Sequence, residues 1–103
     1  MTIVPISAER TWFAIAPDGT EHDVVLQVST PTQQPDGGWS VSVSLGTLEA
    51  DVHNIFGVDS WQAISLGMRF AAMRVNDFAD NGWKFFWERG GDPASSSDIA
   101  KCE

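Results

Sequence analysis

The pattern of hydrophobic residues changes its period at residues 57–63, which read Gly-Val-Asp-Ser-Trp-Gln-Ala. Before this segment, apolar residues alternate with polar ones as in half-buried strands. After it, they recur every three or four residues as in an amphipathic helix. The carboxylate of Asp59 can accept a hydrogen bond from an amide of the first helical turn, and the side chain of Gln62 can reach back, as in a capping box. The sequence therefore predicts an α+β fold in which a sheet precedes one long helix.

The residues before the helix predict an antiparallel four-stranded meander. Residues 6–16 and 21–29 flank Pro-Asp-Gly-Thr at 17–20, in which proline restricts φ and glycine accepts a positive φ. A four-residue loop there sets Phe13 opposite Val24. In this register one face is apolar and packs on the core, and it carries Phe13, Ile15, Val24, Leu26 and Val28. The other face is the outer one, and it carries Trp12, Ala14, Asp23 and Val25.

A second hairpin follows a loop rich in proline and glycine at residues 30–38. Residues 39–45, Trp-Ser-Val-Ser-Val-Ser-Leu, alternate strictly and predict a half-buried strand. Glycine and threonine at positions 46 and 47 suit a two-residue turn, which leads to a fourth strand at residues 48–56. This register places Glu49, Asp51 and His53 on the outer face opposite serines, together with Asp23.

The helix is expected at residues 60–80, and it ends before Asn81 and Gly82, which favour a left-handed cap. Two apolar stripes run along it. One stripe consists of Trp61, Ile64, Met68, Ala71, Val75 and Phe78, and the other of Ala63, Leu66, Phe70 and Met73. Together they are wider than one sheet face requires, so we expect additional cover from the last strand, the C-terminal tail or another chain.

A short fifth strand is expected at residues 83–88, with Trp83, Phe85 and Trp87 pointing inward. Residues 1–88 thus form a single α+β domain. Residues 89–103 are rich in glycine, proline, serine and charge, a composition that predicts a mobile C-terminal tail.

The charge and the cysteine content exclude several classes of function. Six lysines and arginines against fourteen aspartates and glutamates give a formal net charge of −8, which repels nucleic acid phosphates and anionic lipid headgroups. Neither nucleic acid nor a membrane is therefore expected as a partner. Cys102 is the only cysteine, so no intrachain disulfide can form. The first residues lack a basic segment followed by an apolar run, and we expect a cytoplasmic protein.

Three polar residues offer the nearest approach to a metal site. Glu49, Asp51 and His53 alternate along one predicted strand, so they project from one face about 7 Å apart. With Asp23 they present carboxylate and imidazole groups, which suit zinc, manganese or iron. The serines expected opposite them supply no further strong ligand, so we favour a solvated polar face without metal or cofactor. No nucleophile with an adjacent base is apparent, and we expect no catalytic residues.

The outer sheet face has the composition of a protein-binding surface. Trp12 and Val25 lie there beside the acidic residues Asp23, Glu49 and Asp51, with His53 at the end of the row, which resembles a hot spot with an acidic rim. The alternative for Trp12 is that the N-terminal segment or the tail covers it. We therefore expect a non-enzymatic protein-binding module. A small metal-dependent or small-molecule-binding enzyme on the same face, and a structural homodimer through the second helix stripe, are the alternatives.

Residues 57–64 resemble a small uncharacterised bacterial domain family whose helix begins with the signature Gly-x-Asp-Ser-x-Gln-Ala. The resemblance extends over residues 10–88 and implies a bacterial origin and the same fold. The family has no assigned activity, so the resemblance transfers no functional residue. Gly67 and Arg69 depart from a more uniformly aliphatic helix. The chain is also similar, as a short acidic protein without catalytic groups, to bacterial immunity proteins that neutralise toxins. That likeness implies a basic toxin as the partner.

Overall fold

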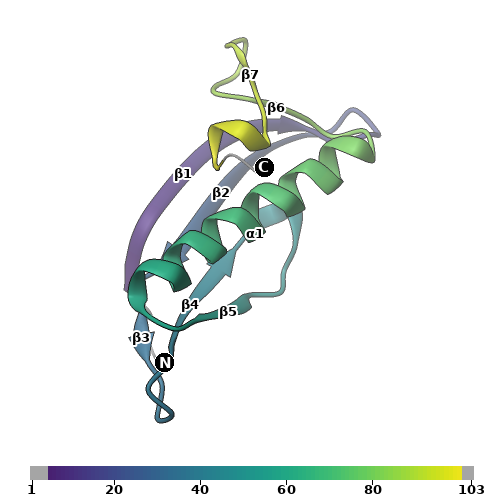
Figure 1. Cartoon of the computed structure of the whole chain (residues 1–103). Helices are drawn as coiled ribbons and strands as arrows, with labels where there is room; N and C mark the ends of the chain where they lie inside the picture. The colour runs from purple at the N-terminus through teal and green to yellow at the C-terminus, as the bar shows by residue number, and fades with distance from the viewer. Residues whose placement is uncertain (1–4, 101–103) are drawn as a thin grey trace.

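A curved antiparallel sheet wraps around one long helix in the computed structural model, which describes residues 5–100 (Figure 1). Four strands follow one another as a meander: β1 (Ile6–Ile15), β2 (Glu21–Ser29), β4 (Trp39–Ser44) and β5 (His53–Gly57). Helix α1 (Ser60–Asp80) crosses one face of this meander. The predicted α+β fold, with its four-stranded meander and single long helix, is confirmed.

Three short strands extend the sheet. β3 (Thr32–Gln33) pairs with β4 on the edge opposite β5, because Trp39 pairs with Gln33 on one side and with Gly57 on the other. β6 (Lys84–Phe86) follows α1 and pairs with β1 at the far edge of the meander, and it corresponds to the predicted fifth strand. β7 (Pro93–Ala94) pairs with β6.

The register of the first hairpin differs by one residue from the predicted register. Trp12 pairs with Val24, and Phe13 pairs with Asp23. The reason is a three-residue loop: the amide of Gly19 (φ 89°) donates to the carbonyl of Ala16 at 2.8 Å, as in a type I turn closed by a glycine bulge. A shift of one residue exchanges the two faces of a strand, so Trp12 and Ala14 face the helix and Phe13 faces outward.

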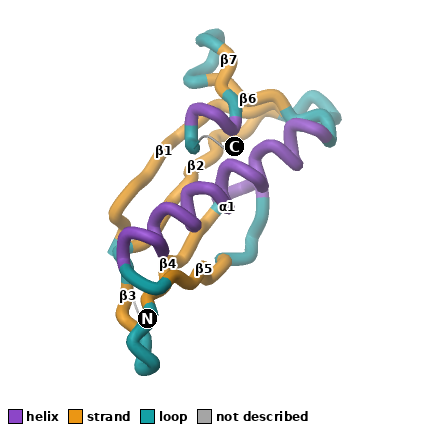
Figure 2. Tube along the Cα trace, viewed as in Figure 1, coloured by secondary structure: helices purple, strands orange, loops and turns teal. Residues whose placement is uncertain are grey.

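The second hairpin also departs from the prediction, here by three residues. His53 pairs with Val43 and Ile55 pairs with Val41. Instead of a two-residue turn, the chain forms a short 3-10 helix, η1 (Gly46–Leu48), which buries the side chain of Leu48. A loop then runs along the side of the molecule to β5 (Figure 2). As a result, His53 lies on the helix side of the sheet rather than on its outer face.

Both ends of α1 form as the sequence predicts. Asp59 Oδ1 accepts a hydrogen bond from the backbone N–H of Gln62 at 2.7 Å. The side-chain Oε1 of Gln62 accepts one from the backbone N–H of Val58 at 2.8 Å. At the other end Gly82 adopts φ 104°, and the Trp83 amide donates to the Phe78 carbonyl at 3.1 Å. This 6→1 bond is that of a Schellman cap.

Small residues bring α1 close to the sheet. The buried side of the helix carries Ala63, Gly67, Ala71, Ala72 and Val75. A Cβ atom placed on Gly67 would lie 2.7 Å from Val41 Cγ2, so a larger residue does not fit there. The two predicted apolar stripes are therefore only partly right, because Trp61 and Met73 are exposed, while Ile64, Met68, Phe70 and Phe78 pack at the margins of the core.

Residues 89–100, part of the segment expected to be a mobile tail, fold back on the domain. After β7 the chain forms a second 3-10 helix, η2 (Ser96–Asp98), which contacts α1. Ala94 is buried, and Ile99 packs against the core. This segment provides part of the extra cover that the wide helix surface needs, so a domain boundary at residue 88 would divide residues that pack together. Cys102 lies outside the described residues. Within those residues, no helix is long and apolar enough to cross a membrane.

Candidate functional site

The six residues predicted to form a binding surface lie in three separate places. Asp23 and Val25 lie on the outer sheet face, as predicted. Trp12 lies in the core. The remaining three, Glu49, Asp51 and His53, lie in and after the connection between β4 and β5. The predicted hot spot with an acidic rim is therefore not assembled.

Trp12 is a core residue, which corrects its predicted role as an exposed anchor. Its side chain is 1% exposed, and its ring lies 6.0 Å from that of Phe85 and 5.6 Å from that of Trp87. Within residues 5–100 its buried Nε1 has no hydrogen-bond partner. An unpaired indole N–H opposes burial, but the large apolar ring area favours it, and the second effect is the larger one here.

The outer face near Asp23 is partly covered by residues that follow β6. The guanidinium of Arg89 lies 4.9 Å from the Phe13 ring centre and forms an ion pair with Glu21 at 2.6 Å. Phe86 also contacts Phe13, with ring centres 6.2 Å apart. The aromatic residues on this face are thus Phe13 and Phe86, and both Asp23 and the Arg89 cation lie beside Phe13.

Glu49, His53 and Arg74 form a polar cluster that links the β4–β5 connection to α1. Glu49 Oε1 lies 2.9 Å from His53 Nε2, and Glu49 Oε2 accepts a hydrogen bond from Arg74 Nη2 at 3.0 Å. The hydrogen bond from His53, helped by Arg74, lowers the pKa of Glu49 below its usual value. The His53 ring also packs on Phe70, with centres 4.8 Å apart. We call these three polar residues the clamp.

The clamp does not extend to a metal site. Asp51 is exposed on the loop, and Asp23 lies on the opposite face of the sheet from His53. Among the described residues, no three histidine, cysteine, aspartate or glutamate side chains are close enough together to hold a metal ion. Each polar group of the clamp is already paired, which suits a link between two elements of the fold.

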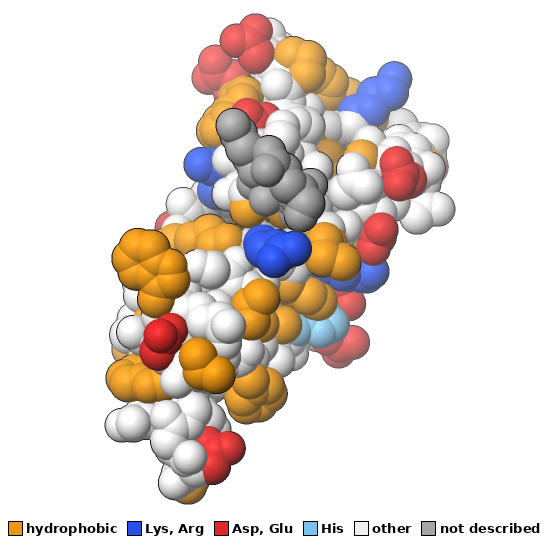
Figure 3. All heavy atoms as spheres, in the orientation of Figure 1, with side chains coloured by type: hydrophobic (Ala, Val, Ile, Leu, Met, Phe, Trp, Pro, Cys, Tyr) orange, Lys and Arg blue, Asp and Glu red, His pale blue; other side chains and the backbone are white. Residues whose placement is uncertain are grey.

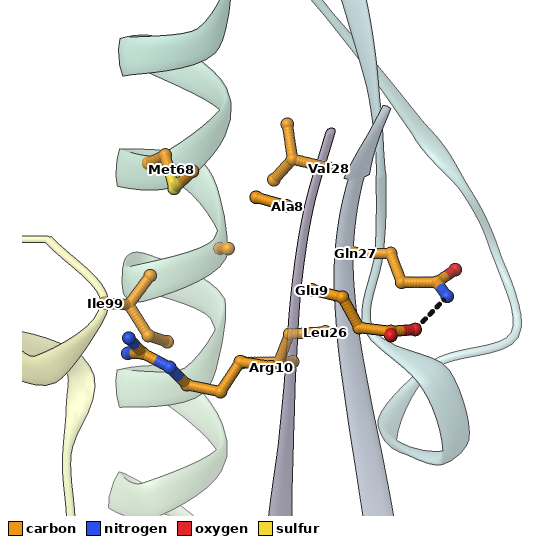
Figure 4. Close-up of a pocket in the computed structure, with 9 residues that line it drawn as sticks. Ala8, Glu9, Arg10, Leu26, Gln27, Val28, Met68 and Ile99 are labelled. Carbon is orange, nitrogen blue, oxygen red and sulfur yellow. Dashed lines mark hydrogen bonds between the residues drawn. The ribbon is translucent and has the colours of Figure 1, made fainter. Parts of the chain in front are cut away.

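On the opposite side of α1, an apolar pocket opens between the helix and β1 (Figure 4). Its volume is about 100 Å³. Ala8, Val28, Met68 and Ile99 point into it, whereas Glu9 and Gln27 point away to the outer face and hydrogen-bond to each other at 2.7 Å. Arg10 lies at the rim. The sequence gives no sign of this pocket, because the composition of residues 89–103, which include Ile99, predicts a mobile tail.

Three exposed apolar side chains lie at the start of α1. We call Phe56, Val58 and Trp61 the helix-start patch; their side chains are 62%, 75% and 82% exposed. Figure 3 shows hydrophobic side chains gathered over this end of the helix. Sequence reasoning placed Trp61 in the core stripe. Its position relative to Ala63 gave a contrary signal, because two residues turn a helix by about 200°, so both side chains cannot face the same sheet.

The match with known proteins covers most of the fold. The family model described as a domain of unknown function, DUF6968, matches residues 8–92, which include β1 from Ala8 onward, the other strands of the meander and α1. This confirms the expectation of an uncharacterised domain family. The bacterial origin and the helix-start signature stay predictions. No curated protein and no solved structure shows significant similarity to the chain.

Proposed function

We propose that this chain, which belongs to the DUF6968 family of domains of unknown function, is a non-enzymatic protein-binding domain that uses the helix-start patch. The observation that carries the proposal is the exposure of Trp61, whose side chain is 82% accessible to solvent. Tryptophan is one of the residue types enriched among side chains that dominate binding energy. A second surface would bury its ring together with Phe56 and Val58.

Other residues make the contacts that seat α1 on the sheet, which supports a role for Trp61 outside the fold. The small residues Ala63, Gly67 and Ala71 make the contact between α1 and the sheet, and Asp59 caps the helix through its own side chain. An exposed tryptophan leaves apolar area in contact with water, and large contiguous apolar patches on a surface mark interaction sites. Binding a partner is the simplest use for this area.

The charge of the chain indicates the kind of partner. A net charge of −8 attracts a positively charged protein over the screening distance of about 8 Å at physiological ionic strength. We therefore propose a basic protein partner, and an immunity-like role in which the domain neutralises a basic toxin is one form of this proposal. A cytoplasmic location in a bacterium belongs to the same proposal.

A comparison of two alanine variants tests the function. Wild-type protein, Trp61→Ala and Met73→Ala are each immobilised and exposed to an extract of the cells that make the protein. Met73 is the matched control, because it is also exposed and apolar on α1 but lies outside the patch. We expect a protein retained by wild type and Met73→Ala and lost with Trp61→Ala, and its purified form should bind Trp61→Ala at least tenfold more weakly. Equal binding by all three would contradict the proposal.

A homodimer through the helix-start patch is the second candidate, because the patches of two copies of the chain would bury each other in a two-fold symmetric interface. Sedimentation of wild type and Trp61→Ala separates the two: a dimer that Trp61→Ala dissociates favours self-association. The metal-dependent enzyme has no support from the arrangement of Asp23, Glu49, Asp51 and His53, and we do not propose it.

A further inference from the structure

The edge of β1 that faces away from β2 is paired over only part of its length. β6 pairs with Phe13, Ala14 and Ile15. Between Ala8 and Thr11, where β1 pairs regularly with β2, no strand from the described part of the chain pairs with this edge. β6 ends at Phe86, and the chain then turns away, with the Trp87 amide donating to the Asp92 carbonyl. An exposed row of backbone donors and acceptors of this kind can accept another strand.

The apolar pocket lies directly beside this open edge. Ala8 belongs to the edge, Leu26 and Val28 of β2 also line the pocket, and Met68, Ala71 and Ile99 line it from the helix and the C-terminal segment (Figure 4). In a strand added to β1, every second side chain would point toward the helix. One of these side chains would then enter the pocket. A volume of about 100 Å³ suits one branched aliphatic side chain, because a cavity of about 150 Å³ is enough for benzene.

Arg10 adds a charge requirement to the same site. It is the next residue of β1 on the helix side after Ala8, and its guanidinium lies 4.9 Å from the Trp87 ring centre and donates to the Asp98 carbonyl. Across residues 5–100, no carboxylate forms an ion pair with it, although Arg74 and Arg89 are both paired. A guanidinium has five N–H donors, so donors remain for a ligand carboxylate.

We propose that the open edge of β1 binds an extended peptide segment of a partner protein as an added antiparallel strand, with an acidic residue opposite Arg10 and an aliphatic side chain in the pocket. In an antiparallel strand, the residue opposite Arg10 precedes the residue opposite Ala8 by two positions. The recognised pattern is therefore acidic, any residue, aliphatic. Main-chain hydrogen bonds supply affinity in this mode, and the pocket and Arg10 supply selectivity. The inference rests on the proposed function only in taking the partner to be a protein.

A second copy of this chain fits the edge poorly. The helix-side residues of the open edge are Ala8 and Arg10. When two copies of this edge pair about a two-fold axis, either the two Arg10 side chains face each other or each faces an alanine, and no aliphatic side chain larger than alanine enters the pocket. The pocket and the unpaired charge both favour a foreign strand.

Peptide titration followed by nuclear magnetic resonance tests the proposal. The probe is a capped seven-residue threonine peptide with glutamate at its third position and leucine at its fifth. We expect shifts of the amide signals of Ala8–Thr11 and slower exchange of the Glu9 and Thr11 amide protons, which point away from β2. Peptides with threonine in place of leucine, or with glutamate and leucine exchanged, should bind at least about tenfold more weakly. A proline at the fourth position should abolish binding, because it removes a backbone donor.

Two protein variants separate the pocket from the charge. Ala8→Phe fills the pocket and should abolish binding of the leucine peptide. Arg10→Gln should weaken the glutamate peptide by about tenfold and leave its glutamine analogue unaffected, as expected for loss of a charge-assisted bond. Lys84→Gln, which removes an exposed cation on β6, is the control. The wild-type amide shifts keep the proposal testable should Ala8→Phe fail to fold.

The outcomes distinguish this inference from the proposed function. No binding at millimolar peptide, shifts confined to the helix-start patch, or edge amides protected by self-association would each overturn strand addition. Trp61→Ala should bind the peptide like wild type, because Trp61 does not line the pocket. If Trp61→Ala loses the partner from the cell extract and no peptide binds the edge of β1, the protein-binding function stands and strand addition is overturned.

Discussion

The two sides of α1 differ in how completely they are closed. On the β5 side, five residues of β5 pair with β4, and the clamp ties the preceding loop to the helix through Glu49, His53 and Arg74. On the β1 side, part of the strand edge is unpaired, a pocket opens beside Met68, and Arg10 has no carboxylate partner among residues 5–100. Polar groups on the first side satisfy one another. On the β1 side, the unpaired strand edge and Arg10 can bind another molecule.

This difference separates residues that hold the fold from residues that are free to bind. Trp61 lies seven positions before Met68, and therefore on nearly the same face of the helix about 10 Å away. Trp61 thus lies on the β1 side of the helix, whereas Phe56 belongs to β5. We therefore expect substitutions on the β5 side to change stability and those on the β1 side to change binding.

The largest expected contrast is between two tryptophans. Trp12→Ala should lower the free energy of unfolding by about 3 to 5 kcal/mol, because it empties the contact between the sheet, Phe85 and Trp87. Trp61→Ala should change it by less than about 0.5 kcal/mol, because its side chain is exposed. Urea denaturation measures both values. Similar losses for both variants would show that Trp61 is part of the core.

Trp12 also shows where the sequence is ambiguous. Residues 12–16 are all apolar, so alternation alone does not reveal which side of β1 faces the helix. The register of the first hairpin depends on whether its loop has three or four residues. The residues Pro-Asp-Gly-Thr are compatible with both lengths, and the structure has three. The strict alternation of residues 39–45 and the cap at Asp59 are local and unambiguous, so β4 and α1 were predicted correctly.

The pocket on the β1 side of the helix could not be predicted, because it is formed by contacts between residues distant in sequence. The pocket joins Ala8 to Ile99, and the composition of residues 89–103 gave no sign that Ala94 and Ile99 are anchored. The clamp was missed for a related reason, because the turn at Gly46 continues into η1 and shifts His53 by three positions. The identities of Glu49 and His53 were noted from sequence, but their partner Arg74 was not.

A second prediction concerns the close contact between α1 and β4 at Gly67. Gly67→Val should cost about 1 to 3 kcal/mol, because its Cβ would lie 2.7 Å from Val41 Cγ2 and the helix would have to move away from β4. Ser65→Val, on an exposed position of the same helix, is the control and should change stability by less than about 0.5 kcal/mol. Thermal denaturation of both variants provides the comparison, and an unaffected Gly67→Val would mean that the helix is not seated this closely.

A smaller effect is expected from the clamp, and it should depend on pH. Glu49→Gln should destabilise the protein at pH 7 by up to about 1 kcal/mol, since a partly exposed ion pair contributes no more. The pKa of Glu49 is lowered in the folded protein, so its contribution is complete above the usual glutamate value of about 4.3 and is lost as the pH falls through the lower folded value. The stability difference between wild type and variant should therefore vanish in acid.

Denaturant titrations at pH 7 and in acid measure this difference. Asp51→Asn is the control, because Asp51 lies on the same loop but outside the clamp. A difference that persists unchanged in acid would show that the Glu49 charge does not stabilise the fold.

The smallest effect on stability is expected at Arg10. Arg10→Gln should change the free energy of unfolding by less than about 0.5 kcal/mol, because Arg10 has no ion-pair partner to lose in the described part of the chain and its contact with Asp98 is exposed. Chemical denaturation checks this value. A cost of several kcal/mol would show that Arg10 stabilises the fold, contrary to the binding role assigned to the β1 side.

Photocrosslinking in the cells that make the protein tests most directly whether the β1 side and the helix start are where a partner binds. A photoreactive phenylalanine derivative replaces Trp61 in one variant and Val52 in another; both residues are exposed, but Val52 lies on the loop before β5. We expect position 61 to crosslink to another protein and position 52 not to. Crosslinks from position 52 alone, or from neither position, would contradict it.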